Sequence, residues 1–426
     1  MAESGNNEVI HDGKTAEQLC EERTKRILDA SQLKEPDRIP IQLRTGYLLA
    51  EMGDISNQEL HENHERAQEL LEEAALTFQP DTISGVFGGP GPSKVLGDRM
   101  TKWPGYGLGP NGSFQFDEHE FMKAEDYDDF LADPADWAIR VYTPRAFEAL
   151  EGLATLPPLG MWLYGYYNTM NYGTLLAPPV QSAFEAIAKA AQLVVESQQR
   201  GAESAKRLAK LGFPPVSLLG CLIEAPFDFM SDTLRGMRGI MLDIYRRPDK
   251  LLAAEEKVLE FQLQHAINFS KATGVKYAGI PLHRGSDAFM SLEQFETFYW
   301  PQLKEMMLRL VEEGITPFVL YEGHWEKRLD YLSDLPKGKT IGWFQASDIF
   351  EVKKAVGDTM CIVGGMPVSM LTSGPAERVF NYTKRVCEEV GDDGGFIMST
   401  SIGELQGCDP ELIKLWIDTT KEFGVY

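Results

Sequence analysis

The sequence predicts an α/β protein built as a single (β/α)8 TIM barrel. Near-continuous apolar segments, such as 317–321 and 360–364, alternate with amphipathic helical segments along most of the 426 residues. Strands without polar alternation are buried on both faces, which is typical of a parallel sheet. About eight strand–helix units favour a closed barrel. An open doubly wound sheet is the main alternative, but it would need a glycine-rich first turn, which is absent.

The N-terminal elements follow in order. Residues 1–14 are polar and acidic and are expected to be disordered, so the barrel domain is expected to cover 15–426. A helical extension is predicted over 15–33. Strands are predicted at 38–44 and 78–84, on either side of a helix over 56–78 that Ser56 or Asn57 can cap.

Residues 85–115 contain nine glycines among several prolines and show little periodicity. Long excursions of this kind in compact domains are usually functional or disordered. We interpret the segment as a long Gly-rich loop excursion that covers a pocket as a lid, with Phe87, Trp103 and Tyr106 available to cap a ligand.

The remaining elements complete the barrel. Helices are predicted over 141–153, 181–211, 291–313 and from Asp409 onward, with two more between 224 and 271. Strands are predicted at 159–164, 216–223, 275–280, 317–321, 340–344, 360–364 and 395–399.

Composition excludes several classes of function. Sixty-four acidic residues against 41 basic ones give a net charge of −23, which disfavours nucleic acid and anionic membranes as partners. No apolar run approaches the ~20 residues of a membrane helix. Five widely spaced cysteines indicate reduced thiols and a cytoplasmic protein. A homodimer is expected as well.

The candidate site is predicted from the carboxyl ends of the strands, where barrel enzymes place their active sites. The ionisable or polar residues expected there are Arg44, Asp81, Glu224, His283, Tyr321, Glu322 and His324.

Glu322 and His324 stand two residues apart just after an apolar strand, and in extended chain both side chains would point the same way. Such a pair can bind a metal or act as acid and base. Structural alternatives stay open for other residues. Arg44 could pair with Asp81, Asp348 could cap a helix, and Cys408 could be an inert thiol. The aromatic group Trp162, Tyr164, Tyr166 and Tyr167 could line a substrate pocket or belong to the core.

Several motifs together resemble the uroporphyrinogen decarboxylase superfamily over roughly residues 20–426. They are Arg38-Ile-Pro with Arg44, Cys221-Leu-Ile-Glu-Ala-Pro-Phe-Asp, Phe298-Tyr-Trp-Pro301, Gly364-Gly365, the stretch 394–400, Asp409-Pro-Glu and Phe423-Gly424. That superfamily includes decarboxylases and corrinoid-linked methyltransferases.

The sequence departs from both groups. The decarboxylase loop that holds substrate carboxylates with two arginines reads Leu43-Arg-Thr-Gly-Tyr47 here. The zinc-binding His-x-Cys of thiol methyltransferases is replaced by Tyr321-Glu-Gly323, and the late zinc cysteine by a residue near Ile402.

The resemblance implies a demethylase component that moves a methyl group from a small methyl ether or methylamine to a corrinoid protein. The corrinoid (cobalamin) would come from a partner protein, because the chain has no Asp-x-His-x-x-Gly motif. Zinc on Glu322 and His324, or a protonated His324, would be the electrophile. One alternative is a lyase that decarboxylates a small carboxylated substrate, with Arg44 on the carboxylate and Asp81 stabilising a cation. Another is a non-catalytic binding protein on a barrel scaffold.

Overall fold

The computed structural model describes residues 9–11, 13–86, 88–163, 165, 168–401 and 405–426. The chain divides into two compact units. Unit 1 contains residues 1–87, 202–225 and 262–426, and unit 2 contains residues 88–201 and 226–261. The single domain over 15–426 stays a prediction.

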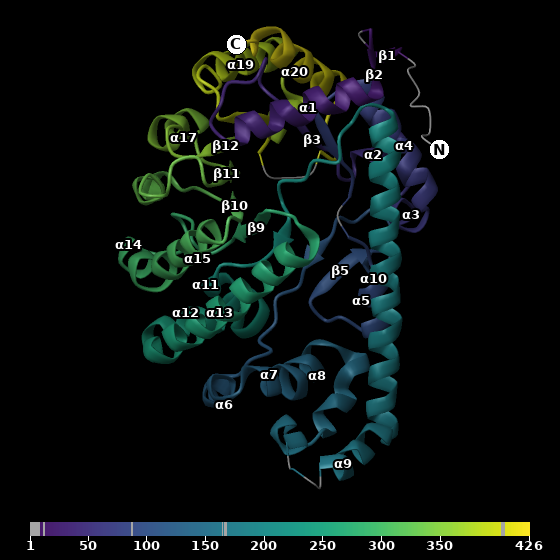
Figure 1. Ribbon diagram of the computed structural model, residues 1–426, viewed down its shortest axis with the longest axis vertical. Helices are drawn as coiled ribbons and strands as arrows, with labels where there is room; N and C mark the ends of the chain where they lie inside the picture. The colour runs from purple at the N-terminus through teal and green to yellow at the C-terminus, as the bar shows by residue number, and fades with distance from the viewer. Residues whose placement is uncertain (1–8, 12, 87, 164, 166–167, 402–404) are drawn as a thin grey trace. The chain divides into compact units, whose positions relative to one another are not determined.

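Eight parallel strands form the centre of unit 1 (Figure 1). Six make one sheet in the order β13-β12-β11-β10-β9-β8, and β3 pairs with β4. Their bounds are β3 Gln42–Arg44, β4 Thr82–Ser84, β8 Cys221–Leu222, β9 Tyr277–Leu282, β10 Thr316–Tyr321, β11 Ile341–Phe344, β12 Cys361–Met366 and β13 Phe396–Thr400. The predicted parallel sheet is confirmed.

The two sheets are joined on one side. A parallel bridge links Ile41 to Met398, whose amide donates to the carbonyl of Pro40 at 2.8 Å. On the other side, the Thr82 hydroxyl donates to the carbonyl of Val216 at 3.3 Å, but in the described part of the chain no backbone ladder joins β4 to β8. The described ladder is therefore open at this point and does not form a closed barrel.

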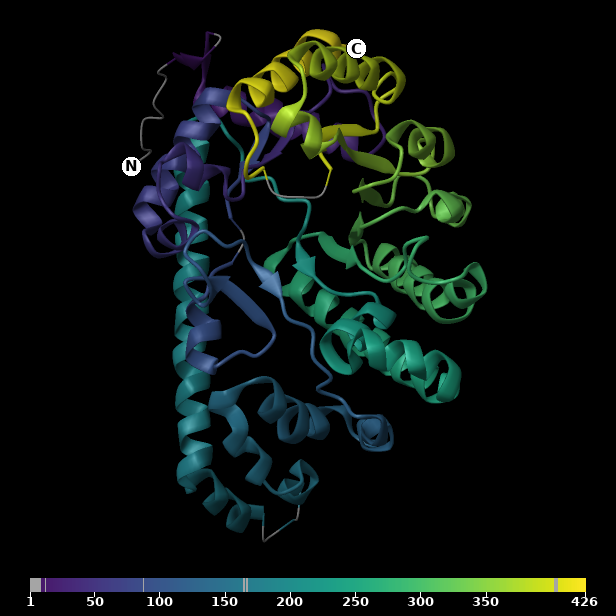
Figure 2. The same ribbon diagram turned by 180° about the vertical axis from the view of Figure 1, so that it is seen from behind.

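Helices surround the strands of unit 1, as both views show for α15, α17, α19 and α20 (Figures 1 and 2). The N-terminal helix α1 instead contributes Ile27 and Ala30 to a core cluster with Phe318, Trp343 and other strand residues. The helices of unit 1 are α1 Ala16–Ser31, α2 Leu48–Met52, α3 Asn57–Glu62, α4 His64–Phe78, α14 Leu292–Gln294, α15 Trp300–Glu312, α16 Leu329–Leu332, α17 Ile349–Val356, α18 Val368–Ser373, α19 Ala376–Glu389 and α20 Pro410–Phe423.

Local signals explain two helix starts. Thr15 and Gln18 form a capping box at α1, and the Asp348 side chain caps α17, so the structural interpretation of Asp348 is confirmed. Upstream of α1, β1 Val9–His11 pairs with β2 Lys14–Thr15 where disorder was expected. The rest of that expectation concerns residues 1–8 and 12, which lie outside the described residues.

Unit 2 replaces the predicted loop excursion with ordered structure. Residues 91–96 form α5, and β5 Thr101–Pro104 pairs with β6 Gly107–Leu108 and β7 Gln115–Phe116. The predicted strand at 159–164 is also wrong, because Leu159–Leu163 is a 3-10 helix. Other helices are α6 Tyr127–Ala132, α7 Pro134–Trp137, α8 Thr143–Ala146, α9 Asn168–Asn171, α11 Pro226–Asp228 and α12 Gly236–Arg246; α10 Pro178–Lys210 and α13 Pro248–Thr273 extend into unit 1.

A buried ionic network holds unit 2 together. The Arg235 guanidinium donates to Asp243 at 2.6 Å, to Glu120 at 2.6 Å and to the carbonyl of Met122 at 2.5 Å. The Tyr127 hydroxyl donates to the same Asp243 at 2.8 Å. No helix in the described part of the chain is long and apolar enough to cross a membrane.

Candidate active site

The alternation of side chains along β10 places Glu322 on the inner face of the sheet. Phe318 and Leu320 both belong to the core cluster that α1 and neighbouring strands share. Because successive side chains of a strand point to opposite faces, Tyr321 lies on the other face and Glu322 follows on the side of Leu320. The same alternation from Tyr277, which packs against that cluster, leads along β9 to His283.

His283 and Glu322 meet at the carboxyl ends of these two adjacent strands. The His283 Nε2 lies 3.8 Å from the Glu322 Oε1. The two side chains are 31% and 34% exposed, so both can contact a ligand. A carboxylate beside an imidazole stabilises the protonated ring, which gives this pair the properties of an assisted general acid.

His324 does not join this pair as predicted. Gly323 has φ +76°, so the chain leaves the extended conformation between the two residues. The His324 side chain is 62% exposed, and its Nδ1 lies 3.4 Å from Glu326 Oε1. The partner that the structure gives to Glu322 is therefore His283.

The turn that carries Glu322 is held by hydrogen bonds to the segment after β11. The Gly323 amide donates to Gln345 Oε1 at 2.8 Å, and the Trp325 amide donates to the Ser347 hydroxyl at 2.9 Å. The Trp325 indole also donates to the carbonyl of Glu322 at 2.8 Å. These bonds fix the backbone that orients the Glu322 carboxylate.

Arg44 ends β3, and its guanidinium lies over the ring of Trp343 at 5.1 Å. The Trp343 indole is fixed by donating to the carbonyl of Thr400 at 2.9 Å. A guanidinium above an indole gains a cation–π attraction, which helps to hold Arg44 at the end of its strand. Arg44 thus supplies positive charge at the strand ends.

Asp81 lies at the opposite end of the strands, so its predicted place at a carboxyl end is wrong. Helix α4 runs to Phe78, so Asp81 precedes β4. The carboxylate is fully buried, accepts from Arg38 at 2.7 and 2.9 Å and from the Ile41 amide at 2.8 Å, and bonds to Arg26. Burial raises the pKa of Asp81, but the positive charges of Arg38 and Arg26 outweigh burial and the pKa is lowered. Asp81 is a structural ion.

Tyr321 and Glu224 have different surroundings. The Tyr321 ring stacks on Phe344 with centroids 4.6 Å apart and meets Trp325 edge-on at 5.0 Å, on the face away from the core cluster. Burial raises the pKa of its hydroxyl, which has no hydrogen-bond partner within the described residues. Glu224 is partly buried and follows β8 by two residues. The structure thus separates Tyr321 from the His283–Glu322 pair.

The donor set does not fit zinc. In the described part of the chain no group of three or more His, Cys, Asp or Glu side chains converges. Catalytic zinc sites take three protein ligands, whereas His283 and Glu322 offer two. Cys408 is buried near Thr372, with its sulfur 3.6 Å from the hydroxyl, and burial raises the pKa of the thiol. The predicted late zinc position near Ile402 lies outside the described residues.

Two features of this site escaped the sequence prediction. The sequence places Trp343 only in a strand, and Gln345, which holds Gly323, is not among the predicted site residues. Counting the alternation along each strand would have placed Glu322 on the side of Leu320 and His283 on the side of Tyr277, but it would not have placed the two strands next to each other. Of the predicted aromatic group, Trp162 belongs to a 3-10 helix, and Tyr164, Tyr166 and Tyr167 lie outside the described residues. Phe87 of the predicted lid lies outside them too.

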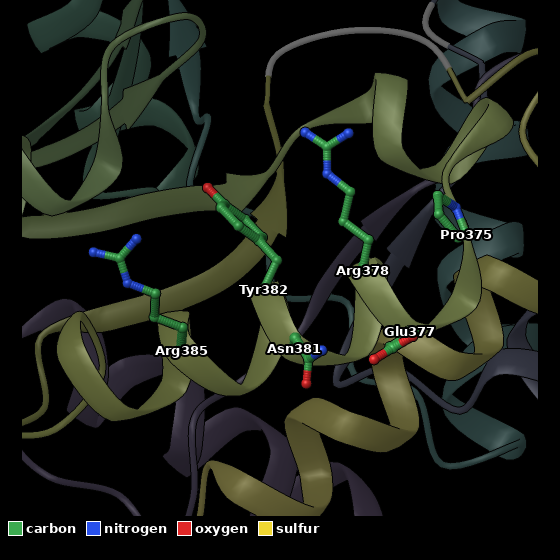
Figure 3. A pocket seen from close by; sticks show the side chains of 6 residues that line it. All are labelled: Pro375, Glu377, Arg378, Asn381, Tyr382 and Arg385. Atoms are coloured by element: carbon green, nitrogen blue, oxygen red, sulfur yellow. The ribbon is translucent and has the colours of Figure 1, made fainter.

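A surface hollow of about 460 Å³ lies elsewhere, over helix α19 (Figure 3). Figure 3 shows Arg378, Tyr382 and Arg385 extending to one side of the helix. The Arg385 guanidinium lies 3.8 Å from the ring centre of Phe350. The hollow is lined by residues of α19 and by Pro375, which precedes that helix, and none of the predicted site residues lines it.

Comparisons with known proteins bear on the family and the fold of this chain. The profile of the uroporphyrinogen decarboxylase (URO-D) family matches residues 169–423. No curated protein matches significantly. Among solved structures, a methyltransferase from Methanosarcina mazei superposes with a TM-score of 0.60 at 16% sequence identity, covering 94% of this chain and 98% of that one.

Proposed function

The chain belongs to the uroporphyrinogen decarboxylase family, and on that premise we propose that it transfers a methyl group from a small methyl ether or methylamine to a corrinoid protein. We also propose that its eight parallel strands belong to a (β/α)8 barrel. The fold shared with a methyltransferase over nearly the whole chain supports both proposals.

The observation that carries the proposed reaction is the contact between His283 and Glu322 at the strand ends. When a methyl group leaves an ether oxygen, that oxygen gains negative charge and needs a proton. A protonated His283 can donate it from Nε2, and the carboxylate of Glu322 stabilises the charged ring before the transfer. The corrinoid of the partner protein supplies the nucleophile that accepts the methyl group. The C–O bond breaks, and the demethylated alcohol leaves with the proton of His283.

A second candidate is decarboxylation of a small carboxylated substrate, and the position of Arg44 favours it. Its guanidinium above Trp343 is suited to a carboxylate. Asp81 cannot stabilise a cation in that reaction, because it is buried between Arg26 and Arg38 at the other end of the strands.

The two functions can be separated by product. Purified protein is incubated with reduced free cobalamin, as a stand-in for the corrinoid protein, and a panel of methyl ethers and methylamines. We expect the absorption change of a methylated corrinoid with at least one donor. His283→Gln should lower this rate by ~10²–10³, the usual cost of losing one stabilising donor in an active site.

His324→Gln is the matched control, because it removes an exposed histidine two residues from Glu322. Its rate should stay near that of the wild type. Equal losses in both variants would contradict the assignment of His283. Release of CO2 from carboxylated compounds, with no methylated corrinoid from any donor, would replace methyl transfer by the second candidate.

A further inference from the structure

Helix α10 has two apolar sides, of which one is buried in unit 2. Ala183 packs into a core cluster with Leu150 and Leu153, and Ala186 packs against the same cluster. Further along, Leu193 approaches to 3.5 Å of the position that a Cβ atom at Gly91 would occupy. The inner side of the helix is therefore covered by other residues of unit 2.

The other apolar side is exposed and follows a heptad spacing. We call it the outer stripe; it consists of Phe184, Ile187, Ala188, Ala191, Val194 and Val195. Phe184, Ile187, Val194 and Val195 are 44%, 37%, 43% and 50% exposed. Apolar residues separated by alternating steps of three and four form a seam that packs against another helix.

Exposed apolar side chains also occur in the segment that precedes α10. Leu163, Met170 and Leu176 are 86%, 74% and 71% exposed, and Leu176 stands two residues before the helix. Exposed apolar side chains grouped along one side of a helix indicate a protein–protein interface.

We propose that the outer stripe packs against the same stripe of a second copy of this chain, antiparallel, with the two-fold axis at Ala191. The residue sizes are self-complementary in this register. Ile187 precedes Ala191 by four residues and Val195 follows it by four, so each isoleucine faces the valine of the other copy. Ala188 and Val194 pair in the same way at three residues, and the small Ala191 side chains let the helices approach at the axis.

The absence of charge on the outer stripe permits contact between two copies. Each chain carries a net charge of −23, so two copies repel each other unless their contact is uncharged. The outer stripe contains no ionisable side chain. Viewed along the helix axis, the nearby charged residues lie more than about a quarter turn from Ala191, the centre of the stripe; they are Glu185, Lys189 and Glu196. Interfaces between identical chains are more apolar than those between different proteins, which fits this surface.

A cysteine at the axis tests the register. In Ala191→Cys the two thiols of a dimer face each other, and mild oxidation should give a species of about twice the 47.7 kDa chain on a non-reducing gel. Lys189→Cys is the matched control, because it lies exposed on the same helix but away from the stripe. Wild type gives the background of the native cysteines, of which four are buried. Equal cross-linking of both variants, or of neither, overturns the register.

Sedimentation tests the dimer itself. Wild type should sediment as a dimer that salt does not dissociate, because the contact is apolar and salt screens the repulsion between the two acidic chains. The double variant Ile187→Glu, Val194→Glu should sediment as a monomer, with circular dichroism unchanged, and Lys189→Glu should stay dimeric. A monomeric wild type at micromolar concentration, or a double variant that stays dimeric, overturns the proposal. The methyl-transfer assay is independent of this result.

Discussion

Asp81 is fully buried and forms ion pairs with two arginines from different segments. Arg26 comes from α1 and Arg38 from the chain that leads into β3, and both are also largely buried. The Asp81 carboxylate therefore ties the N-terminal helix to the base of two strands. Removing one member of such a group leaves buried charges uncompensated, which costs far more than the group contributes as a whole.

Asp81→Asn should lower the free energy of unfolding by ~3–5 kcal/mol, measured by urea denaturation at neutral pH. Because the pKa of Asp81 is lowered in the fold, its contribution is present above the ordinary carboxyl pKa of about 4 and is lost as the pH falls through the folded value. The variant should therefore lose less stability in acid than wild type. Asp37→Asn, a change at a 64% exposed partner of Arg26, is the control and should cost much less. Equal losses in both variants would contradict this account.

At the candidate site, one glycine changes which residues meet. A side chain two residues after Glu322 would point the same way only if the chain stayed extended. Gly323 adopts a positive φ, in which glycine carries no steric penalty, and its amide reaches Gln345. His324 is consequently directed to Glu326, and the imidazole that faces Glu322 comes from the neighbouring strand.

Helix α20 contains a lysine in an unfavourable environment. Lys421 lies in the last turn and is partly buried. Burial lowers the pKa of its ammonium to about 8, and the positive charges of Arg38 and Arg23 act in the same direction against Asp81 and Asp418. The helix is thus less stable with this lysine charged.

Lys421→Met should raise the melting temperature near pH 7. The folded pKa lies below the unfolded one, so between about pH 8 and 10.5 the unfolded chain binds more protons and wild-type stability rises with pH. The advantage of the variant should accordingly shrink near pH 9.5. Lys414→Met, on the same helix beside Asp418, should show no such change. An advantage of Lys421→Met that is equal at both pH values would refute the role of its charge.

At the scale of the whole molecule, unit 2 is an insertion with a core of its own. Its segments 88–201 and 226–261 are separate in sequence, and the Arg235 network joins them through Glu120, Met122 and Asp243. Asp243 is fully buried, so its charge depends on these partners.

Arg235→Met should weaken this network by several kcal/mol, as expected when a buried pair loses one partner. Hydrogen–deuterium exchange should rise within 88–201 and 226–261 and change little in the strands of unit 1. Arg246→Met, at an exposed position of helix α12, which begins just after Arg235, is the control. Exchange that rises equally in both units would instead support one cooperative domain over residues 15–426.

The sequence by itself determined the parallel sheet, the order of most strands and helices, the caps of several helices and the family. These features depend on local signals, namely apolar runs, helical periodicity, capping residues and short motifs. It also placed Glu322 and His283 at strand ends. It missed the ordered structure of 88–115, because glycine and proline weaken periodicity in short strands as much as in loops.

Only the tertiary structure decided which of the candidate residues act together. The contact between His283 and Glu322 depends on the register of β9 and β10, since the two residues stand far apart in sequence. The burial of Asp81 depends on Arg26 and Arg38 arriving from other segments. Contacts of this kind depend on how distant parts of the chain pack, and no local pattern in one sequence encodes that packing.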